Sequence, residues 1–295
     1  MKILILALVT LLSLSAFSDS NKEKREEKKN GNKEEKSELD RHPKPLSVFD
    51  VIPLNSPVKE SVAKFLLKMP VGLEIDEVKY KVKNASRLFE KDKPHQKIDL
   101  VDGPQGKELH ISVSRLPPGF YQLFVKVRDR KNKEHEFKTK YKDHAMFVVD
   151  SSLQVPVPNE KENNKTVAGV DSDGDGIRDD IQRWINEEFS SQPKVKMAMK
   201  QMAMGRQLDL LSVSIREQSI IASNKYLNDA ICLSSIVGID QKSKLNRELD
   251  SKLLNTKNRL YADMKANANF SGQAWDLPNT PEERKALCAF NPDNF

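Results

Sequence analysis

The sequence is poor in the residues that most often build catalytic centres and zinc sites. Its 295 residues include two cysteines and five histidines, and no histidine follows His144. Two thiols are too few for a four-cysteine zinc site, and the C-terminal half has no histidine to form a Ser-His-Asp or Cys-His arrangement. The sequence also has no GxxxxGK[ST], GxGxxG, HExxH or GxSxG motif, which excludes the common nucleotide-binding, zinc-protease and α/β-hydrolase signatures.

A long apolar run is also absent, except at the very beginning. Residues 1–18 combine one lysine, a short apolar run and small residues near position 18, which is the pattern of a secretory signal peptide. The run is shorter than the ~20 residues of a membrane span, although an uncleaved anchor is the alternative. No cysteine stands directly after the run, which argues against a lipid anchor. We therefore expect a periplasmic, secreted or cell-surface protein with no membrane span after removal of the signal.

Apolar residues are nearly absent from the next segment, residues 19–45, which is rich in lysine and glutamate. A segment with so little to bury cannot offset the conformational entropy lost on ordering. It is therefore predicted to be a disordered charged linker, with a partner-binding arm as the alternative. Acidic and basic residues are interleaved in the rest of the chain, so we expect no nucleic-acid partner.

Short segments with alternating apolar and polar residues dominate residues 46–150. Residues 78–83 and 109–114 alternate most clearly, and turn-forming residues at 102–106 and 117–119 separate the apolar runs. A period of two marks strands that are buried on one face, and several short strands at this spacing are typical of a β-sandwich. Residues 46–150 are therefore predicted to form an all-β sandwich domain.

Residues 116–129 contain a Gly-Phe-Tyr turn that leads into an alternating strand ending in Asp129. This segment resembles the penultimate strand of immunoglobulin-like and fibronectin-like domains. The resemblance implies an immunoglobulin-like fold, and it implies that Tyr121 is a corner tyrosine whose hydroxyl binds nearby backbone. Such folds serve many functions, so the fold alone assigns none.

The pattern changes after a linker at residues 151–170, which is rich in proline, asparagine and lysine. In residues 177–295 apolar residues recur three or four apart, which is the period of an amphipathic helix. Pro193 and Pro281 each suit the first turn of a helix. An all-α helical domain is therefore predicted for residues 177–295. The methionines at 197–204 would suit Cu(I), but a flexible core stripe is the simpler explanation.

An acidic loop, residues 171–182, lies at the junction of these two patterns and has the sequence DSDGDGIRDDIQ. Aspartates fall at its first, third, fifth and ninth positions, and a glycine falls at the sixth, where calcium loops turn sharply. Alternate residues of a tight loop direct their oxygens at one hard cation. The candidate calcium ligands are Asp171, Asp173, Asp175, the Ile177 carbonyl, Asp179, Asp180 and Gln182.

The acidic loop resembles the calcium loops of thrombospondin type 3 repeats and of EF-hand-like modules in exported bacterial proteins. The resemblance implies a bound Ca²⁺ and a periplasmic or surface location, and it implies nothing about catalysis. Gln182 stands where an EF-hand has a bidentate glutamate, so Asp180 is a candidate for the last ligand. We therefore expect a weak, structural site with a Kd of ~10⁻⁴–10⁻³ M. The alternative is an ion-free turn whose aspartates cap the following helix.

The two cysteines form the remaining pair of candidate site residues. In an exported protein, an even number of cysteines suggests a disulfide, and Cys232 and Cys288 are its predicted partners. Two buried free thiols are the alternative.

Together these features favour an exported, non-enzymatic, calcium-binding protein of the bacterial envelope or surface, with a binding or structural role. Its predicted fold is multidomain: an all-β immunoglobulin-like sandwich, a calcium loop and an all-α helical domain. Its expected partner is an envelope protein or a glycan, and its oligomeric state is open. The alternative is a calcium-dependent enzyme that acts on glycan or peptidoglycan at the domain junction. Asp179 and Asp180 could in principle form an acid/base pair, but they are adjacent in sequence, and ion ligation or helix capping is the simpler explanation.

Overall fold

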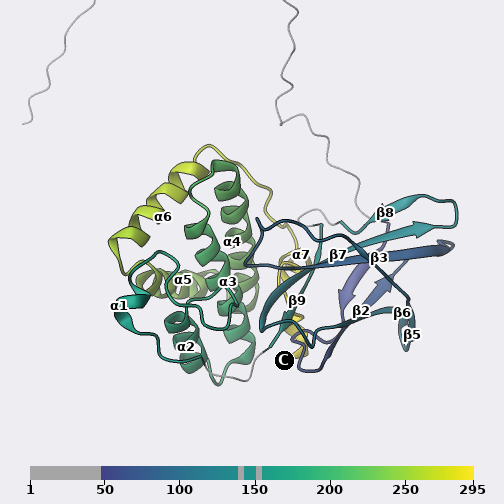
Figure 1. Cartoon of the computed structure of the whole chain (residues 1–295), viewed down its shortest axis with the longest axis horizontal. Coiled ribbons are helices and arrows are strands. Elements are labelled where there is room, and N and C mark those ends of the chain that lie inside the picture. The colour runs from purple at the N-terminus through teal and green to yellow at the C-terminus, as the bar shows by residue number, and fades with distance from the viewer. Residues whose placement is uncertain (1–47, 139–142, 151–154) are drawn as a thin grey trace, which may run out of the picture. The chain divides into compact units, whose positions relative to one another are not determined.

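The computed structural model describes residues 48–138, 143–150 and 155–295, and the predicted signal peptide (1–18) and charged linker (19–45) lie outside the described residues. Two antiparallel β-sheets and seven α-helices form the described part of the chain (Figure 1). This arrangement is compatible with the predicted sheet domain and helical domain. None of the described helices combines the length and the apolar composition needed to cross a bilayer.

The β region, residues 48–150, contains nine strands in its described residues. They are β1 (Asp50–Pro53), β2 (Val62–Lys68), β3 (Ile75–Asn84), β4 (Gln96–Ile98), β5 (Val101–Gly103), β6 (Gly106–Ser112), β7 (Gly119–Asp129), β8 (Glu134–Glu136) and β9 (Ala145–Val149). One sheet has the order β1-β2-β6-β5, and the other has the order β4-β3-β7-β8, with β9 also paired to β7. Because β7 pairs with three antiparallel neighbours, it is the central strand of the second sheet.

The two sheets enclose a shared hydrophobic core, because alternate residues of a strand point to the same face. In β2 the buried residues are Ala63, Phe65 and Leu67, and they alternate with more exposed ones. Phe65 packs edge-on against Phe147 of β9, with ring centroids 5.3 Å apart, so this contact joins one sheet to the other. The alternation in the sequence is therefore the inward and outward pattern of two facing sheets.

Tyr121 lies near the start of β7, and its ring is buried in this core, stacked on Phe147 at 5.4 Å. Its hydroxyl donates a hydrogen bond of 2.7 Å to the carbonyl of Pro117, four residues earlier. Burial raises the pKa of Tyr121 to about 12, because the ionised phenolate would lose its hydration. The bond predicted between the Tyr121 hydroxyl and nearby backbone is confirmed, and it fixes the turn that leads into β7.

The helical region, residues 155–295, begins with a single-turn helix and continues with longer ones. The helices are α1 (Glu160–Asn163), α2 (Asp179–Glu188), α3 (Pro193–Leu211), α4 (Arg216–Val237), α5 (Ile239–Leu253), α6 (Lys257–Phe270) and α7 (Pro281–Lys285), followed by the 3-10 helix η2 (Pro292–Asn294). Pro193 and Pro281 occupy first-turn positions, as predicted, because proline lacks the N–H that a helix start leaves unbonded. α7 also has a capping box, in which Thr280 and Glu283 bind each other's backbone N–H groups.

The predicted linker, residues 151–170, is partly described and contains α1. Arg259 of α6 holds this segment, because its guanidinium donates hydrogen bonds to the carbonyls of Asn163 and Thr166. Arg259 has no exposed surface. Burial, reinforced by the charge of Arg178, lowers the pKa of its guanidinium to about 10. The described part of this segment is therefore fixed to the helices before the acidic loop begins.

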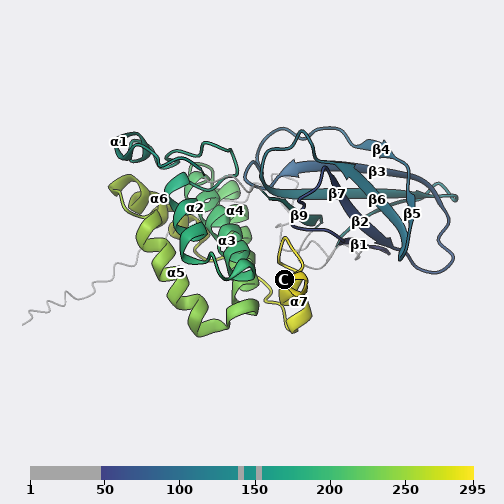
Figure 2. The same cartoon turned by 90° about the horizontal axis from the view of Figure 1, so that it is seen from below.

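A second hydrophobic cluster joins the β region to the helical region. It combines β-region residues, including Phe120, Met146 and Val148, with apolar residues of α2, α3, α4 and α5. Ser56 adds hydrogen bonds at the same boundary, since it donates to the carbonyl of Ala289 (3.0 Å) and accepts from the N–H of Val148 (3.0 Å). The segment after α7 therefore lies beside β1 and β9 (Figure 2).

Candidate metal centre

The acidic loop, residues 171–182, follows α1 and includes the first turn of α2. Its two glycines adopt left-handed backbone conformations, with φ of +73° at Gly174 and +87° at Gly176, which residues with a β-carbon rarely adopt. The N–H of Asp179 donates to the carbonyl of Val170 at 2.8 Å and closes the loop where α2 begins. The chain thus folds back on itself, so that the start and the end of the acidic loop meet.

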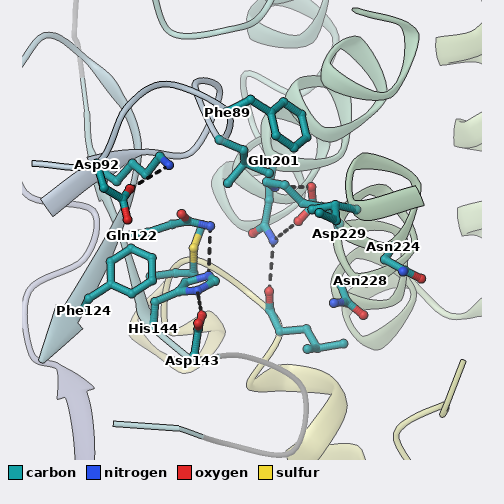
Figure 3. Close-up of a pocket in the computed structure, with 16 residues that line it drawn as sticks. Phe89, Asp92, Gln122, Phe124, Asp143, His144, Gln201, Asn224, Asn228 and Asp229 are labelled. Carbon is teal, nitrogen blue, oxygen red and sulfur yellow. Dashed lines mark hydrogen bonds and ion pairs between the residues drawn. The ribbon is translucent and has the colours of Figure 1, made fainter. Parts of the chain in front are cut away.

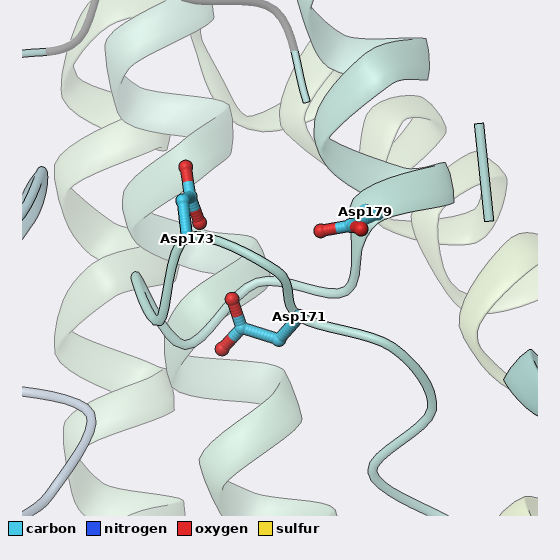
Figure 4. Close-up of side chains that lie close together, drawn as sticks. All are labelled: Asp171, Asp173 and Asp179. Atoms are coloured by element: carbon cyan, nitrogen blue, oxygen red, sulfur yellow. The ribbon is translucent and has the colours of Figure 1, made fainter. Parts of the chain in front are cut away.

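Three carboxylates converge in this loop, those of Asp171, Asp173 and Asp179 (Figure 4). One oxygen from each lies within 4.8 Å of the others, which is close enough for all three to coordinate one cation. The N–H groups of Gly174 and Gly176 each donate to the Asp171 carboxylate at 2.9 Å and hold it in place. An ionised carboxylate has about four lone-pair sites, so these bonds leave room for a cation.

Two buried oxygens at this cluster have no hydrogen-bond partner among the residues that the structure describes. Asp179 has no exposed surface, and its Oδ2 is unpaired, whereas its Oδ1 accepts from the N–H of Ser172 at 2.9 Å. Gln182 is also buried, and its Oε1 is unpaired while its Nε2 donates to Asp173 Oδ2 at 3.0 Å. An unpaired buried oxygen costs free energy, and a divalent cation held by the three carboxylates would supply the missing partner of Asp179 Oδ2.

Burial, followed by repulsion from Asp173, raises the pKa values of two loop aspartates. Desolvation of its carboxyl group raises the pKa of Asp171 to about 6, and repulsion from Asp173 adds to the shift. Burial raises the pKa of Asp175 well above its ordinary value, again with a contribution from Asp173. Lys200 of α3 lowers the Asp175 pKa but does not offset the rise. A bound cation would favour the ionised forms of both groups.

Asp175 and Asp180, two other predicted ligands, lie outside this group of three carboxylates. Asp175 is buried, and its Oδ1 accepts from the N–H of Ile177 at 2.7 Å, so this oxygen is already bonded to the loop backbone. The Ile177 side chain lies in the hydrophobic cluster that joins the two regions, and the predicted ligand of this residue, its backbone carbonyl, stays a prediction. Asp180 is paired with Arg178, with 2.9 Å between Asp180 Oδ2 and Arg178 Nη2. The structure brings together four of the predicted ligand residues: Asp171, Asp173, Asp179 and Gln182.

Arg178 anchors the acidic loop to the helical region, and sequence reasoning missed this role. It is almost fully buried, and its guanidinium donates to the carbonyls of Lys252 (2.8 Å) and Leu253 (3.3 Å) at the C-terminal end of α5. The last carbonyls of a helix have no partner within it, and a cation suits the negative end of the helix dipole. The signal available in the sequence was a single cation inside an otherwise acidic loop.

The acidic loop also touches the β region and α3. A β-carbon built on Gly176 would lie 2.2 Å from the β-carbon of Ser86, which follows β3, and 3.2 Å from Cγ of Met204 in α3. A β-carbon built on Gly119, at the start of β7, would lie 3.5 Å from the α-carbon of Asp175. The acidic loop is therefore packed against both regions of the protein.

Cys232 and Cys288 form a disulfide, with their Cα atoms 5.0 Å apart, and the predicted pairing is confirmed. Cys232 lies in α4 and Cys288 follows α7, so the bond connects segments that are 56 residues apart. Gln201 of α3 supports the same junction, because its Oε1 accepts from the N–H of Ala289 at 2.8 Å. The bond therefore fastens the segment after α7 to the longest described helices.

Comparison with known proteins adds no assignment to this site. No protein-family model matches the chain, and no curated protein gives a significant match. The resemblance of the acidic loop to thrombospondin type 3 and EF-hand-like loops therefore stays a prediction from its sequence. The geometry of the acidic loop, rather than kinship, supports an assignment of function.

Proposed function

We propose that the acidic loop binds one calcium ion, and that this ion fastens the β region to the helical region. The observation that carries the proposal is the buried, unpaired Oδ2 of Asp179 beside the carboxylates of Asp171 and Asp173. A hard cation with a flexible coordination number satisfies such oxygens. The spacing of the aspartates and the left-handed conformation of Gly176 favour calcium among such cations.

Four side chains of the acidic loop would supply the first ligands. Asp171, Asp173 and Asp179 would each offer a carboxylate oxygen, and Gln182 would offer its amide oxygen after a half-turn of the amide group. That rotation would replace the present Nε2 contact with Asp173 by an oxygen that faces the cation. Asp175 would add a ligand by giving up its backbone hydrogen bond. Because no glutamate is available for bidentate binding, the expected Kd is ~10⁻⁴–10⁻³ M.

The role of the ion follows from what the acidic loop contacts. Arg178 binds the C-terminal end of α5, and Gly176 packs against Ser86 of the β region. A cation that fixes the torsions of the loop would therefore stabilise the contact of the loop with both regions. This is a structural role, and it requires no catalytic residue.

The β region is proposed to be an immunoglobulin-like sandwich. One sheet, β1-β2-β6-β5, corresponds to the ABED sheet of that fold when the strands are lettered in chain order. The other corresponds to the CFG sheet if β3 is C, β4 is an added C′ strand, β7 is F, and β8 and β9, which both pair with β7, together take the place of G. The bond between Tyr121 and Pro117 supports the same fold.

The protein is proposed to work outside the cytoplasm, in the bacterial periplasm or at the cell surface, with a non-enzymatic binding or structural role. The disulfide between Cys232 and Cys288 supports this location, because such bonds persist in oxidising compartments. The proposed partner is an envelope protein or a glycan. Immunoglobulin-like modules commonly present binding surfaces, but the fold does not name the partner.

Thermal melts in calcium and in EDTA test the calcium site. At ~10 mM CaCl₂ and a Kd of ~10⁻⁴ M, binding contributes about 2.7 kcal/mol to stability. For a chain of this size that raises Tm by roughly 5–11 °C. Asp173→Asn should remove most of the shift, whereas the control Asp99→Asn, at an exposed aspartate of the β region, should keep it. Identical melts in the two buffers would overturn the proposal.

A calcium-dependent hydrolase predicts a different outcome for variants of the same loop. Loss of glycan or peptidoglycan hydrolysis in an Asp173→Asn/Asp175→Asn variant, with Tm unchanged, would favour an enzyme. A wild-type chain that hydrolyses neither substrate and melts higher in calcium would favour the structural role.

A further inference from the structure

A cavity to which no residue of the acidic loop contributes lies between the β region and the helices α3 and α4 (Figure 3). Its volume of about 400 Å³ is in the range of small-molecule sites. Gln122 and Phe124 of β7 line one side, and Asn224 and Asn228 of α4 line another. Phe89, from the connection between β3 and β4, adds an apolar wall.

The charged side chains at this cavity are already paired. Three pairs have N···O distances of 2.6–3.0 Å: Lys83 with Asp92, Lys225 with Asp229, and His144 with Asp143. Among the described lining residues, no cation is left to attract a phosphate or carboxylate, and no carboxylate is left to attract an ammonium group. The lining therefore favours a ligand without net charge.

Two amide side chains at the cavity are free to bind a ligand. Asn224 and Asn228 lie one helical turn apart on α4, so they are neighbours on the same face, and both line the cavity. Neither side chain has a hydrogen-bond partner in the described part of the chain. Each amide offers two donor hydrogens and an acceptor oxygen. This cavity wall therefore presents donors and acceptors side by side.

Phe89 provides the free aromatic face. About 36% of this residue is exposed, and it stacks on no other ring among the described residues. Phe124, by contrast, has Lys81 Nζ 4.5 Å from its ring centroid and the His144 ring 5.3 Å away. A ligand in the cavity would therefore meet one open ring together with the two amides of α4.

We infer that this cavity binds a neutral saccharide of one or two rings. A sugar ring has an apolar face of C–H groups that fits a phenyl ring, and a rim of hydroxyls that each donate and accept hydrogen bonds. The amides of Asn224 and Asn228, with β-carbons about 5–6 Å apart, suit two hydroxyls of such a rim. A wholly apolar ligand would leave both amides desolvated and unpaired, and an anion would meet no free cation.

Saturation-transfer difference NMR on the intact chain tests the inference, with cellobiose, maltose and N,N′-diacetylchitobiose as probes. At least one neutral probe should receive transfer, strongest at the protons of one ring face. Glucuronate should receive much less, because the charged groups of the cavity are paired with one another. Absence of transfer to all three probes at ~10 mM, or equal transfer to glucuronate, would overturn the inference.

Variants of the residues that line the cavity test whether the saccharide binds there. Asn224→Leu and Asn228→Leu should each weaken binding at least about fivefold, as expected for lost hydrogen bonds. Phe89→Leu keeps an apolar side chain but removes the ring, and it should weaken binding about threefold or more. Asn258→Leu, at an exposed asparagine of α6, is the matched control and should bind as the wild type does.

A lowered Tm in a leucine variant would not block the test. Asn224→Asp and Asn228→Asp keep the shape of the side chain and remove two donor hydrogens, so they should show the same loss of binding. Unchanged affinity in the Asn228 variants and in Phe89→Leu would show that the saccharide does not bind in this cavity. Because no acidic-loop residue lines the cavity, failure here would leave the calcium proposal intact.

Discussion

The β-carbon of Ser86 lies only 2.2 Å from the position that a β-carbon on Gly176 would occupy. Ser86 follows β3 in the β region, whereas Gly176 is the sharp-turn residue of the acidic loop. The glycine therefore serves two purposes, because it permits the left-handed turn of the loop and it lets the loop approach the β region. Contact with a distant strand and the shape of a cation site depend on the same residue.

Gly176→Ala should destabilise the chain by more than the ~1–2 kcal/mol that a left-handed alanine costs, because its methyl group would collide with Ser86. Gly72→Ala is the matched control, since Gly72 has a φ of +86° and no atom within 4 Å of an added β-carbon. Urea denaturation of the two variants measures the difference. Adding Ser86→Gly to Gly176→Ala should recover part of the stability, and no recovery would contradict the collision.

Asp179→Asn should change stability in opposite directions with and without calcium. In EDTA the substitution removes one of three crowded carboxylates with a buried, unpaired oxygen, so Tm should rise. In ~10 mM calcium it removes a ligand, so Tm should fall below that of the wild type. An aspartate that merely caps α2 would lower Tm in both buffers when replaced, and that result would argue against the cation.

Arg178→Met should be costly, because it leaves Asp180 and the end of α5 without their buried partner. The expected loss is ~3–5 kcal/mol of unfolding free energy. Arg130→Met is the control, since Arg130, which follows β7, is exposed and forms an ion pair with the exposed Glu74, so the expected loss is within about 1 kcal/mol. Denaturant melts compare the two, and equal losses would show that Arg178 is no anchor.

Removal of the disulfide should lower stability by about 4 kcal/mol, because the bond between Cys232 and Cys288 closes a loop of 56 residues in the unfolded chain. The Cys232→Ser/Cys288→Ser variant and the reduced wild type should give the same denaturation midpoint. A loss well under 1 kcal/mol would mean that packing alone holds the segment after α7.

Acid should weaken the turn between β7 and β8 through Asp129. Its Oδ1 accepts from the N–H groups of Lys131 and Lys133 at 2.9 Å, and His135 Nε2 lies 3.1 Å from its Oδ2. These bonds hold the pKa of Asp129 below its ordinary value. The hydrogen bond from the Lys133 N–H has the largest effect, and the contact with the His135 ring has the next largest. An acid with a lowered folded-state pKa adds stability above its unfolded pKa, near ~3.9, and loses it as pH falls further.

The check on this prediction is the difference in Tm between the wild type and Asp129→Asn, measured from about pH 6 to pH 3. The difference should be largest above about pH 4 and should shrink as the carboxyl takes up a proton. A difference that stays constant over this range would contradict the role of the ionised carboxylate.

The convergence of Asp171, Asp173 and Asp179 could be predicted from the sequence, because a ligand pattern is local and needs only a tight turn. Two predicted ligands, Asp175 and Asp180, lie outside the cluster for local reasons that the spacing does not reveal. Asp175 accepts a bond from its own loop backbone, and Asp180 meets the neighbouring arginine. A spacing rule gives the positions of side chains along the chain, and it does not say which of them find other partners.

Most long-range contacts could not be predicted from the sequence, and the pairing of Cys232 with Cys288 is the exception because the chain has only two cysteines. Alternating apolar and polar residues predicted the strands, and apolar residues spaced three or four positions apart predicted the helices. Both patterns can be read from residues that are close in sequence. Arg259 binds Asn163 across 96 residues, and nothing near either position marks the pair. The cavity between Phe89 and Asn228 was missed for the same reason, since its walls meet only in the folded chain.

The hydrogen bond from Ser56 to the carbonyl of Ala289 joins residues 233 positions apart. A ribosome makes the chain from its N-terminus, so the strands emerge long before the segment that covers them. During that interval the apolar side chains of Phe120 and Val148 would face water, and incompletely folded chains with exposed apolar surface tend to aggregate. Translocation of an unfolded chain, as the proposed export implies, would postpone collapse until helices and strands are present together.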